Sequence, residues 1–149
     1  MSLIPLCKEC IEMDLKGKDK NEILNSLIEL ISYSGKINDI EVFRKAIFDR
    51  EKKITTGIGS GIAIPHAKSD GVDSFSLAFA RSKAGLDFAS MDNKSVHLFF
   101  ILGAPVDHDD DYLKGMSELS GLLKDPIFRN KLLEAKSKDE IYNLIIGEN

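Results

Sequence analysis

The chain has 149 residues, of which 43% are hydrophobic and 30% are charged, and its formal net charge is −4. This composition predicts one globular domain over residues 1–149 and excludes an intrinsically disordered chain. The acidic balance and the lack of a basic stripe exclude nucleic acid as the main partner and argue against an anionic membrane surface.

The two cysteines, Cys7 and Cys10, have C-x-x-C spacing. A zinc site would need a second pair of ligands, and a redox motif would need a strand-to-helix active-site turn. We therefore expect two reduced, half-buried thiols in a reducing compartment. Because no signal peptide opens the chain and no apolar run approaches the length of a membrane span, a cytoplasmic protein is expected.

The N-terminal part is predicted to contain a strand followed by a helix. A short turn or helix is expected at 5–10, and the alternation of apolar and acidic residues over 11–15 predicts a half-buried strand. Asp19, with a glutamate three residues later, has the spacing of a capping box. Apolar residues at helical spacing then predict an amphipathic helix over 20–34 that ends at Gly35.

A second helix is predicted directly after the first. Asn38, again with a glutamate three residues later, supplies the start signal. The apolar face of this helix includes Val42, and the helix is expected to end near Arg50 or Lys52.

Two strands are predicted in the middle of the chain. Residues 75–81 alternate large apolar residues with small ones, and a loop containing Gly85 follows. Residues 96–102 are apolar except for His97, as in a strand that is buried on both faces. For His97 we expect a packed or edge-facing structural role.

The C-terminal part is predicted to be three helices. The first follows the acidic segment 107–111, which suits the positive end of a helix. Asp125 before a proline and Ser137 before a glutamate start the other two. The helix after the acidic segment is expected to carry, on one side, Leu113, Met116, Leu119, Ser120 and Leu123. The whole order predicts an α/β fold: one single-domain sandwich of a mixed β-sheet with helices on both faces.

The segment 55–69 is the most constrained part of the sequence. It carries glycines at alternate positions 57, 59 and 61 and then Pro65 directly before His66. Glycine permits positive φ, and proline stiffens the backbone and favours an extended residue before it. The glycine backbone could also present N–H groups to an anion. This pattern suits either a histidine held in place for chemistry or a histidine in a structural turn.

Several kinds of enzyme chemistry lack their partners here. No nucleophile and carboxylate stand out for a serine or cysteine triad, and the glycines lack the Lys-Ser/Thr pair of a Walker loop. What remains is His66 as a nucleophile that forms a phosphoryl intermediate. Arg50 could bind the phosphoryl oxygens, because its planar fork matches their geometry. Further donors could come from Thr55, Thr56, Ser60 and Ser69.

A different class of function, metal binding or metal-dependent hydrolysis, would rest on His108 and the aspartates around it. The acidic run lacks the glycine and the terminal glutamate of a calcium loop, so a solvated surface is the default expectation. We expect no metal and no cofactor.

Arg50-Glu51, a threonine-containing gap and the run 57–66 resemble the enzyme IIA domain of the bacterial phosphoenolpyruvate-dependent sugar phosphotransferase system, in its fructose/mannitol class. The resemblance covers nearly the whole chain, through residues 75–81, 85–88, 96–105, 113–123 and 125–128. It implies that His66 accepts a phosphoryl group from the histidine-containing phosphocarrier protein and passes it to a IIB component. Arg50 would hold that group, and a membrane IIC component would be served indirectly.

The chain departs from the family at one position. Members often carry a second active-site histidine before a leucine, where this chain has Tyr112. Tyrosine can donate or accept one hydrogen bond but is not a cation at neutral pH. His108, four residues earlier, is the alternative partner. We expect His66 to act without a second histidine.

The same resemblance leaves two roles open. One is a phosphocarrier for uptake of fructose or a polyol. The other is that of the nitrogen-regulatory type, which acts by binding target proteins according to its phosphorylation state.

Overall fold

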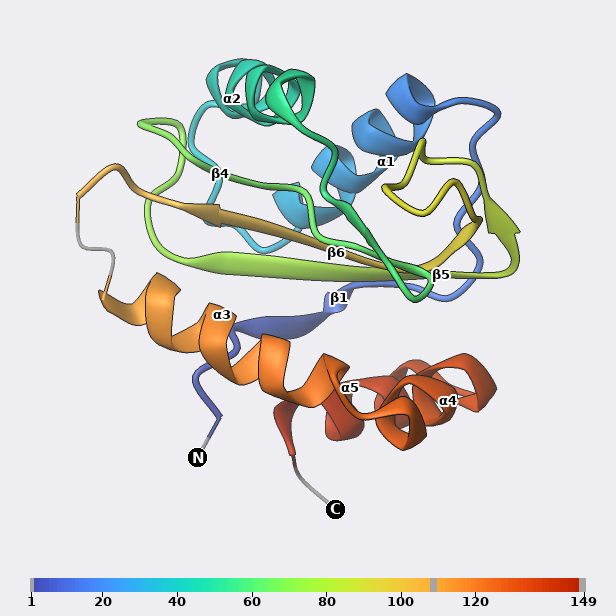
Figure 1. Cartoon of the computed structure of the whole chain (residues 1–149). Coiled ribbons are helices and arrows are strands. Elements are labelled where there is room, and N and C mark those ends of the chain that lie inside the picture. The colour runs from blue at the N-terminus through green and yellow to red at the C-terminus, as the bar shows by residue number, and fades with distance from the viewer. Residues whose placement is uncertain (1, 108–109, 148–149) are drawn as a thin grey trace.

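The computed structural model describes residues 2–107 and 110–147. A six-stranded mixed sheet lies between two layers of helices, with α1 and α2 on one face and α3, α4 and α5 on the other (Figure 1). The predicted fold class is therefore confirmed. In chain order the elements are β1 (Leu6–Glu12), α1 (Lys20–Ser32), α2 (Ile40–Lys53), β2 (Gly57–Gly59), β3 (Ile62–Ala63), β4 (His66–Lys68), β5 (Ser76–Leu86), β6 (Val96–Ala104), α3 (Asp110–Leu123), α4 (Pro126–Glu134) and α5 (Lys138–Ile146).

The long strands β5 and β6 form the centre of the sheet. The strand order is β1-β5-β6-β3-β2, and β4 pairs with the C-terminal part of β6 beyond β3. β5 and β6 are antiparallel, and so are β2 and β3, whereas β1 runs parallel to β5, and β3 and β4 run parallel to β6. In this register His66 lies beside Leu102, close to the end of β6.

The prediction for the N-terminal strand was wrong. β1 begins at Leu6, within the segment expected to be a turn or helix, and it ends at Glu12 rather than at Leu15. Its register with β5 shifts between Leu6 and Ile11. Such an irregularity destroys the alternation of buried and exposed residues by which a strand is recognised in a sequence.

Most helix starts were predicted correctly, because caps are local. The side chains of Asp19, Asp125 and Ser137 each accept a hydrogen bond from a backbone N–H of the first turn. For α2 the predicted cap was wrong: Asp39 caps the helix, while the Asn38 amide donates to Asp73 at 2.6 Å.

Two side chains expected on buried helix faces are exposed. Val42 in α2 is 44% exposed and Leu113 in α3 is 57% exposed. The buried stripe of α3 keeps the predicted Leu119 and Leu123, but its first turns bury Tyr112 and Gly115 in place of Leu113, which is also a helical spacing. The sequence permits either stripe, and packing against the sheet selects the one with the tyrosine.

β5 is longer than predicted, because it continues through Gly85 to Leu86. Gly85 has a positive φ of 88° and lies where the register with β6 shifts. β6 is buried along almost its full length, as expected for a strand covered on both faces. Phe79 and Phe100 pack with ring centroids 5.0 Å apart across these two strands. In the described residues, none of the helices combines the length and apolar character needed to cross a membrane.

Candidate functional site

The glycine segment folds into a tight hairpin. β2 and β3 are antiparallel, and the turn between them has positive φ at Gly59, Ser60 and Gly61. The spacing of the glycines is therefore explained largely by the turn, where a side chain on a left-handed residue costs conformational energy.

The carboxylate of Asp92, in the loop after β5, lies beside the turn of this hairpin, where an added Cβ at Gly59 would be 3.4 Å from its Oδ2. The N–H of Lys94 chiefly, and the N–H of Ser60 more weakly, hold the pKa of Asp92 below its ordinary value. Gly57 lies against the same loop, where an added Cβ would come within 2.9 Å of the Ser90 Cα. The hairpin is thus anchored to the loop after β5, and the Met91 N–H and the Ser90 hydroxyl both donate to the Gly57 carbonyl oxygen at 2.9 Å.

His66 begins β4 and is partly exposed. Its Nδ1 donates a hydrogen bond of 2.8 Å to the carbonyl oxygen of Ile64. The Ile64 N–H in turn donates to the Thr56 carbonyl oxygen at 2.9 Å, and the Pro65 carbonyl oxygen accepts from Leu102 on β6. Because a carbonyl oxygen can only accept, the proton of the neutral ring is on Nδ1, and the lone pair is on Nε2.

Arg50 lies in the last turn of α2, the helix that packs on β4. One guanidinium nitrogen, NH1, donates to the carbonyl oxygen of Ile54 at 2.8 Å. This bond ties the side chain to the segment that leads into the hairpin. Guanidinium carries five N–H donors in a planar fork, so a fixed Arg50 can still bind an oxyanion with the others.

Tyr112 lies in the first turn of α3 and is only 7% exposed. Its ring makes an edge contact with Phe75, with centroids 5.6 Å apart, and the Lys68 ammonium lies 5.6 Å from its centroid. Burial raises the pKa of Tyr112, and the nearby charge of Arg50 only partly opposes this. The tyrosine is thus a neutral group beside the Lys68 ammonium, and it also feels the charge of Arg50.

The structure relates Arg50 to Tyr112 and His66 to Lys68. Arg50 and Tyr112 interact electrostatically, although they come from helices on opposite faces of the sheet. His66 and Lys68 are both outward on β4, since the residue between them, Ala67, is buried. Lys68 had no predicted role, because a lysine two residues after a histidine looks like any exposed charge.

Three of the four hydroxyls suggested as further donors form hydrogen bonds inside the fold. Thr56 donates its N–H at 2.8 Å and its hydroxyl at 2.6 Å to the carboxylate of Glu51. The Ser69 hydroxyl accepts from the N–H of Gly71 at 3.0 Å, and the Thr55 hydroxyl accepts from Lys20. These side chains shape the segment around His66 through hydrogen bonds to other residues of the chain.

Glu51 is the residue that sequence reasoning missed. Its side chain is only 5% exposed and forms an ion pair of 2.8 Å with Lys20. Burial opposes its ionisation, yet the donors of Lys20 and Thr56 outweigh burial and hold the pKa of Glu51 below its ordinary value. A glutamate near the end of a helix normally faces solvent, so only the three-dimensional partners reveal its burial.

The ring of His97 is also bonded to backbone carbonyl oxygens. The Nδ1 of His97 lies 3.0 Å from the carbonyl oxygen of Ser82 and 3.1 Å from that of Lys83, which agrees with the structural role expected. His108 and the residue after it, the centre of the acidic run considered as an alternative metal site, lie outside the described residues. Among the residues that are described, no group of three or more His, Cys, Asp or Glu side chains could hold a metal ion.

The cysteines are free thiols, as expected, but Cys10 is fully buried rather than half-buried. Cys7 is partly exposed and Cys10 is buried, both are free thiols, and their sulfur atoms are 3.2 Å apart. Burial, followed by the contact with Cys7, raises the pKa of Cys10 well above its ordinary value. A protonated, buried thiol is a poor nucleophile.

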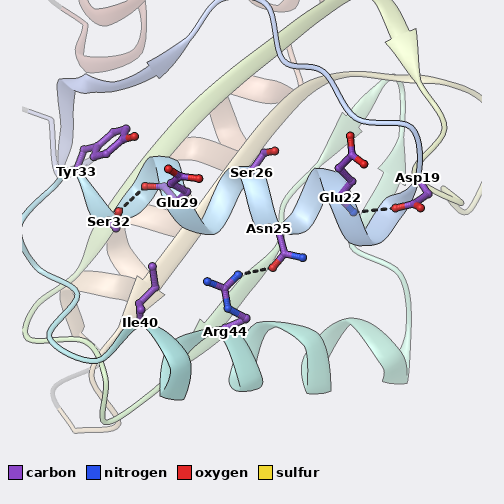
Figure 2. A pocket seen from close by; sticks show the side chains of 9 residues that line it. All are labelled: Asp19, Glu22, Asn25, Ser26, Glu29, Ser32, Tyr33, Ile40 and Arg44. Carbon is purple, nitrogen blue, oxygen red and sulfur yellow. Dashed lines mark hydrogen bonds between the residues drawn. The ribbon is translucent and has the colours of Figure 1, made fainter.

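A large groove lies elsewhere, between α1 and α2 (Figure 2). Its volume is about 690 Å³, and Arg44 reaches across it from α2 to the side-chain oxygen of Asn25 on α1. Its lining is mostly polar: Asp19, Glu22, Asn25, Ser26, Glu29, Ser32, Tyr33, Ile40 and Arg44. None of the predicted site residues belongs to this groove.

Known proteins are similar to this chain in sequence and in fold. Residues 5–147 match the family model described as phosphoenolpyruvate-dependent sugar phosphotransferase system, EIIA 2. The fructose-specific EIIABC component of Bacillus subtilis is 39% identical over 94% of this chain, and the chain spans only 22% of that longer protein. The fructose-specific EIIA component of Haloferax volcanii is 37% identical, with 92% of this chain and 89% of that protein covered.

Solved structures agree. The nitrogen regulatory protein IIA-Ntr of Neisseria meningitidis is 27% identical with a TM-score of 0.85, covering 93% of this chain and 94% of that one. Enzyme IIA mannitol of Escherichia coli, in complex with phosphorylated enzyme IIB mannitol, shares the fold at 23% identity and a TM-score of 0.82, covering 97% and 99%. The chain therefore belongs to the type 2 enzyme IIA family of the sugar phosphotransferase system, in its fructose/mannitol class with nitrogen-regulatory relatives.

Proposed function

We propose that this chain is a phosphocarrier whose single IIA domain accepts a phosphoryl group on His66 and passes it on. The donor is the histidine-containing phosphocarrier protein, and the acceptor is a IIB component that serves a membrane IIC component for uptake of fructose or a polyol. The observation that carries the proposal is the bond from His66 Nδ1 to the Ile64 carbonyl oxygen. It fixes the ring and leaves the Nε2 lone pair as the nucleophile.

The first transfer is a displacement at phosphorus. The Nε2 lone pair attacks the phosphoryl group of the donor's phosphohistidine in line, a new N–P bond forms, and the electron pair of the old N–P bond returns to the donor's imidazole. Because such transfer needs little covalent assistance, positioning and charge stabilisation by Arg50 supply most of the catalysis. No cofactor enters the balance.

The second transfer reverses the roles. A nucleophile of the IIB component, a cysteine thiolate in most of the family, attacks the phosphorus and forms a new bond to it. The bond between phosphorus and Nε2 breaks, and its electron pair returns to His66. The ring is then again neutral and bonded to Ile64. Arg50 releases the oxyanion at this step, so its contact must be strong enough to position the group and weak enough to lose it.

The named relatives support the transport role. The B. subtilis protein is a fructose-specific EIIABC component, which by its name joins A, B and C components, and the E. coli mannitol IIA was solved with phosphorylated IIB. We propose the same sequence of partners here, in the cytoplasm, without nucleic acid.

Onward transfer tests this role. The chain is charged with labelled phosphate from phosphoenolpyruvate through enzyme I and the carrier protein, and purified IIB components of the fructose and mannitol classes are added. Rapid loss of label from the chain to one IIB component is the expected result. A chain that is labelled but transfers to neither would contradict the transport role.

That second outcome would favour the other candidate, a regulatory IIA protein of the nitrogen type. The observation in its favour is the high structural similarity to the IIA-Ntr protein of N. meningitidis, with a TM-score of 0.85. In this role the phosphoryl group on His66 would change the binding of a target protein. Comparing pull-downs with the phosphorylated and unphosphorylated chain would then identify the partner.

A further inference from the structure

A chain of hydrogen bonds leads from a buried carboxylate to the reactive histidine. Glu51 Oε1 accepts from the Thr56 hydroxyl at 2.6 Å, and Glu51 Oε2 accepts from the Thr56 N–H at 2.8 Å. The Thr56 carbonyl oxygen then accepts from the Ile64 N–H at 2.9 Å. The Ile64 carbonyl oxygen accepts from His66 Nδ1 at 2.8 Å. Every link is a normal hydrogen bond.

The same carboxylate also fixes the arginine. Glu51 is the neighbour of Arg50 in the last turn of α2, and its bonds to Thr56 hold the end of that helix against the start of the hairpin. Between them lies Ile54, whose carbonyl oxygen receives the Arg50 guanidinium. Thus one buried group sets the position of the segment that touches both Arg50 and, through Ile64, His66.

Glu51 is itself held firmly. Lys20 on α1 forms an ion pair with its Oε2 at 2.8 Å and also donates to the Thr55 hydroxyl at 3.2 Å. The Lys20 ammonium lies 4.6 Å from the centroid of the Phe88 ring. A buried carboxylate with three donors is costly to form from an unfolded chain, and hydrophobic residues of similar size often stabilise a fold at least as well. Its presence beside the site therefore suggests more than stability.

We propose that Glu51 is a positioning residue for phosphoryl transfer: through Thr56 it holds the Ile64 carbonyl oxygen that keeps the proton of His66 on Nδ1, and it keeps Arg50 in register with that ring. This inference rests on the proposed function of His66. It assigns no contact between Glu51 and the phosphoryl group. Loosening the clamp would let the His66 proton move to Nε2, which removes the lone pair that attacks phosphorus.

Two pairs of variants separate positioning from stability. Thr56→Val removes the hydroxyl that binds Glu51 with little change of shape, and Thr56→Ser restores a hydroxyl at the same place. Glu51→Gln keeps the size of the side chain but removes its charge. Ile145→Ala, in a buried position on α5, creates a cavity elsewhere in the core and serves as the control for lost stability.

Two measurements are made on the full-length chain below the melting temperature of every variant. The first is the single-turnover rate of transfer from the phosphorylated carrier protein, and the second is the pair of ¹⁵N chemical shifts of the His66 ring. Misplacement of reacting groups by an ångström costs on the order of 10²-fold in rate, so Thr56→Val and Glu51→Gln are expected to lose about 10- to 100-fold. Their ring shifts should move toward a mixture of tautomers, whereas Thr56→Ser should recover most of the rate and Ile145→Ala should keep both rate and shifts.

The inference is overturned if Thr56→Val and Glu51→Gln transfer as fast as Ile145→Ala with unchanged ring shifts. If Glu51→Gln does not fold, the two Thr56 variants decide alone. A wild-type chain that takes no phosphoryl group on His66 would refute the proposed function instead. In that case the ¹⁵N shifts still report whether Glu51 fixes the tautomer.

Discussion

At His66 the two ring nitrogens have different surroundings. Nδ1 donates to the Ile64 carbonyl oxygen at 2.8 Å, and the lone pair of the neutral ring is therefore on Nε2. The residue needs no second imidazole to set its tautomer, because the backbone of its own strand does so. For the proposed function, this is how His66 could serve as a defined nucleophile with Tyr112 in place of the second histidine that the family resemblance implies.

Arg50 is expected to stabilise the negative charge on the phosphoryl oxygens in the transition state of the transfer. Arg50→Ala should lower the single-turnover rate about 10²-fold while leaving slow labelling of His66, and Arg50→Lys should recover only part of the loss because a lysine lacks the planar fork. Arg44→Ala is the matched control, since Arg44 is on the same helix but in the α1–α2 groove. Equal rates for the Arg50 and Arg44 variants would exclude this role.

Tyr112 is expected to matter mainly through its ring. Tyr112→Phe keeps the edge contact with Phe75 and the place for the Lys68 ammonium, and it removes only one neutral hydroxyl. A neutral hydrogen bond contributes about 1 kcal/mol, so the transfer rate should fall by less than about fivefold. Loss of all transfer in stopped-flow or quench measurements would show that the hydroxyl acts directly.

At the scale of elements, α2 and the hairpin are joined by Glu51, and this joint should depend on pH. The donors of Lys20 and Thr56 hold the pKa of Glu51 below its ordinary value of 4.5. A carboxyl whose pKa is lowered by folding stabilises the fold above its unfolded pKa, and this contribution disappears as the pH falls through the folded pKa. Glu51→Gln should therefore cost about 1–3 kcal/mol at pH 7 and progressively less below pH 4.5.

Urea unfolding of both proteins between pH 7 and pH 3 measures this difference. Other carboxyls titrate in the same range, but they are common to both proteins and cancel in the comparison. A difference in unfolding free energy that stays constant over the whole range would mean that the charge of Glu51 contributes nothing to the joint.

The elements also show what a sequence can predict. Asp19, Asp125 and Ser137 were recognised as caps because a cap depends on residues within one turn. β1 and the end of β5 were misjudged because their limits depend on pairing between distant segments, across shifts in register at Leu6–Ile11 and Arg81–Leu86. The buried face of α3 was misjudged for a similar reason, since Phe75 fits only against Gly115, where an added Cβ would overlap its ring.

The residues of the candidate site also differ in whether the sequence could identify them. His66 and Arg50 could be named from the sequence, because the glycine–proline–histidine pattern and its resemblance to a family point to them. Glu51 and Lys68 could not, because a glutamate at a helix end and a lysine on a short strand are ordinary surface residues until their partners are known. Burial of Glu51 against Thr56 and the approach of Lys68 to Tyr112 are tertiary facts.

At the scale of the whole molecule, the sheet brings together residues that are far apart in sequence. α2 contributes Arg50 from one helical layer, and α3 contributes Tyr112 from the other (Figure 1). β4 pairs with the end of β6 and places His66 beside Leu102. His66 is partly exposed at this place, which suits the proposed role of a carrier that meets a donor and an acceptor in turn.

The central claim is that His66 receives the phosphoryl group, and intact-protein mass spectrometry tests it most directly. The wild-type chain, His66→Ala and the control His97→Ala are each incubated with phosphoenolpyruvate, enzyme I and the carrier protein. We predict that the wild type and His97→Ala each gain one phosphoryl group and that His66→Ala, still folded, gains none. Full phosphorylation of His66→Ala would contradict the account.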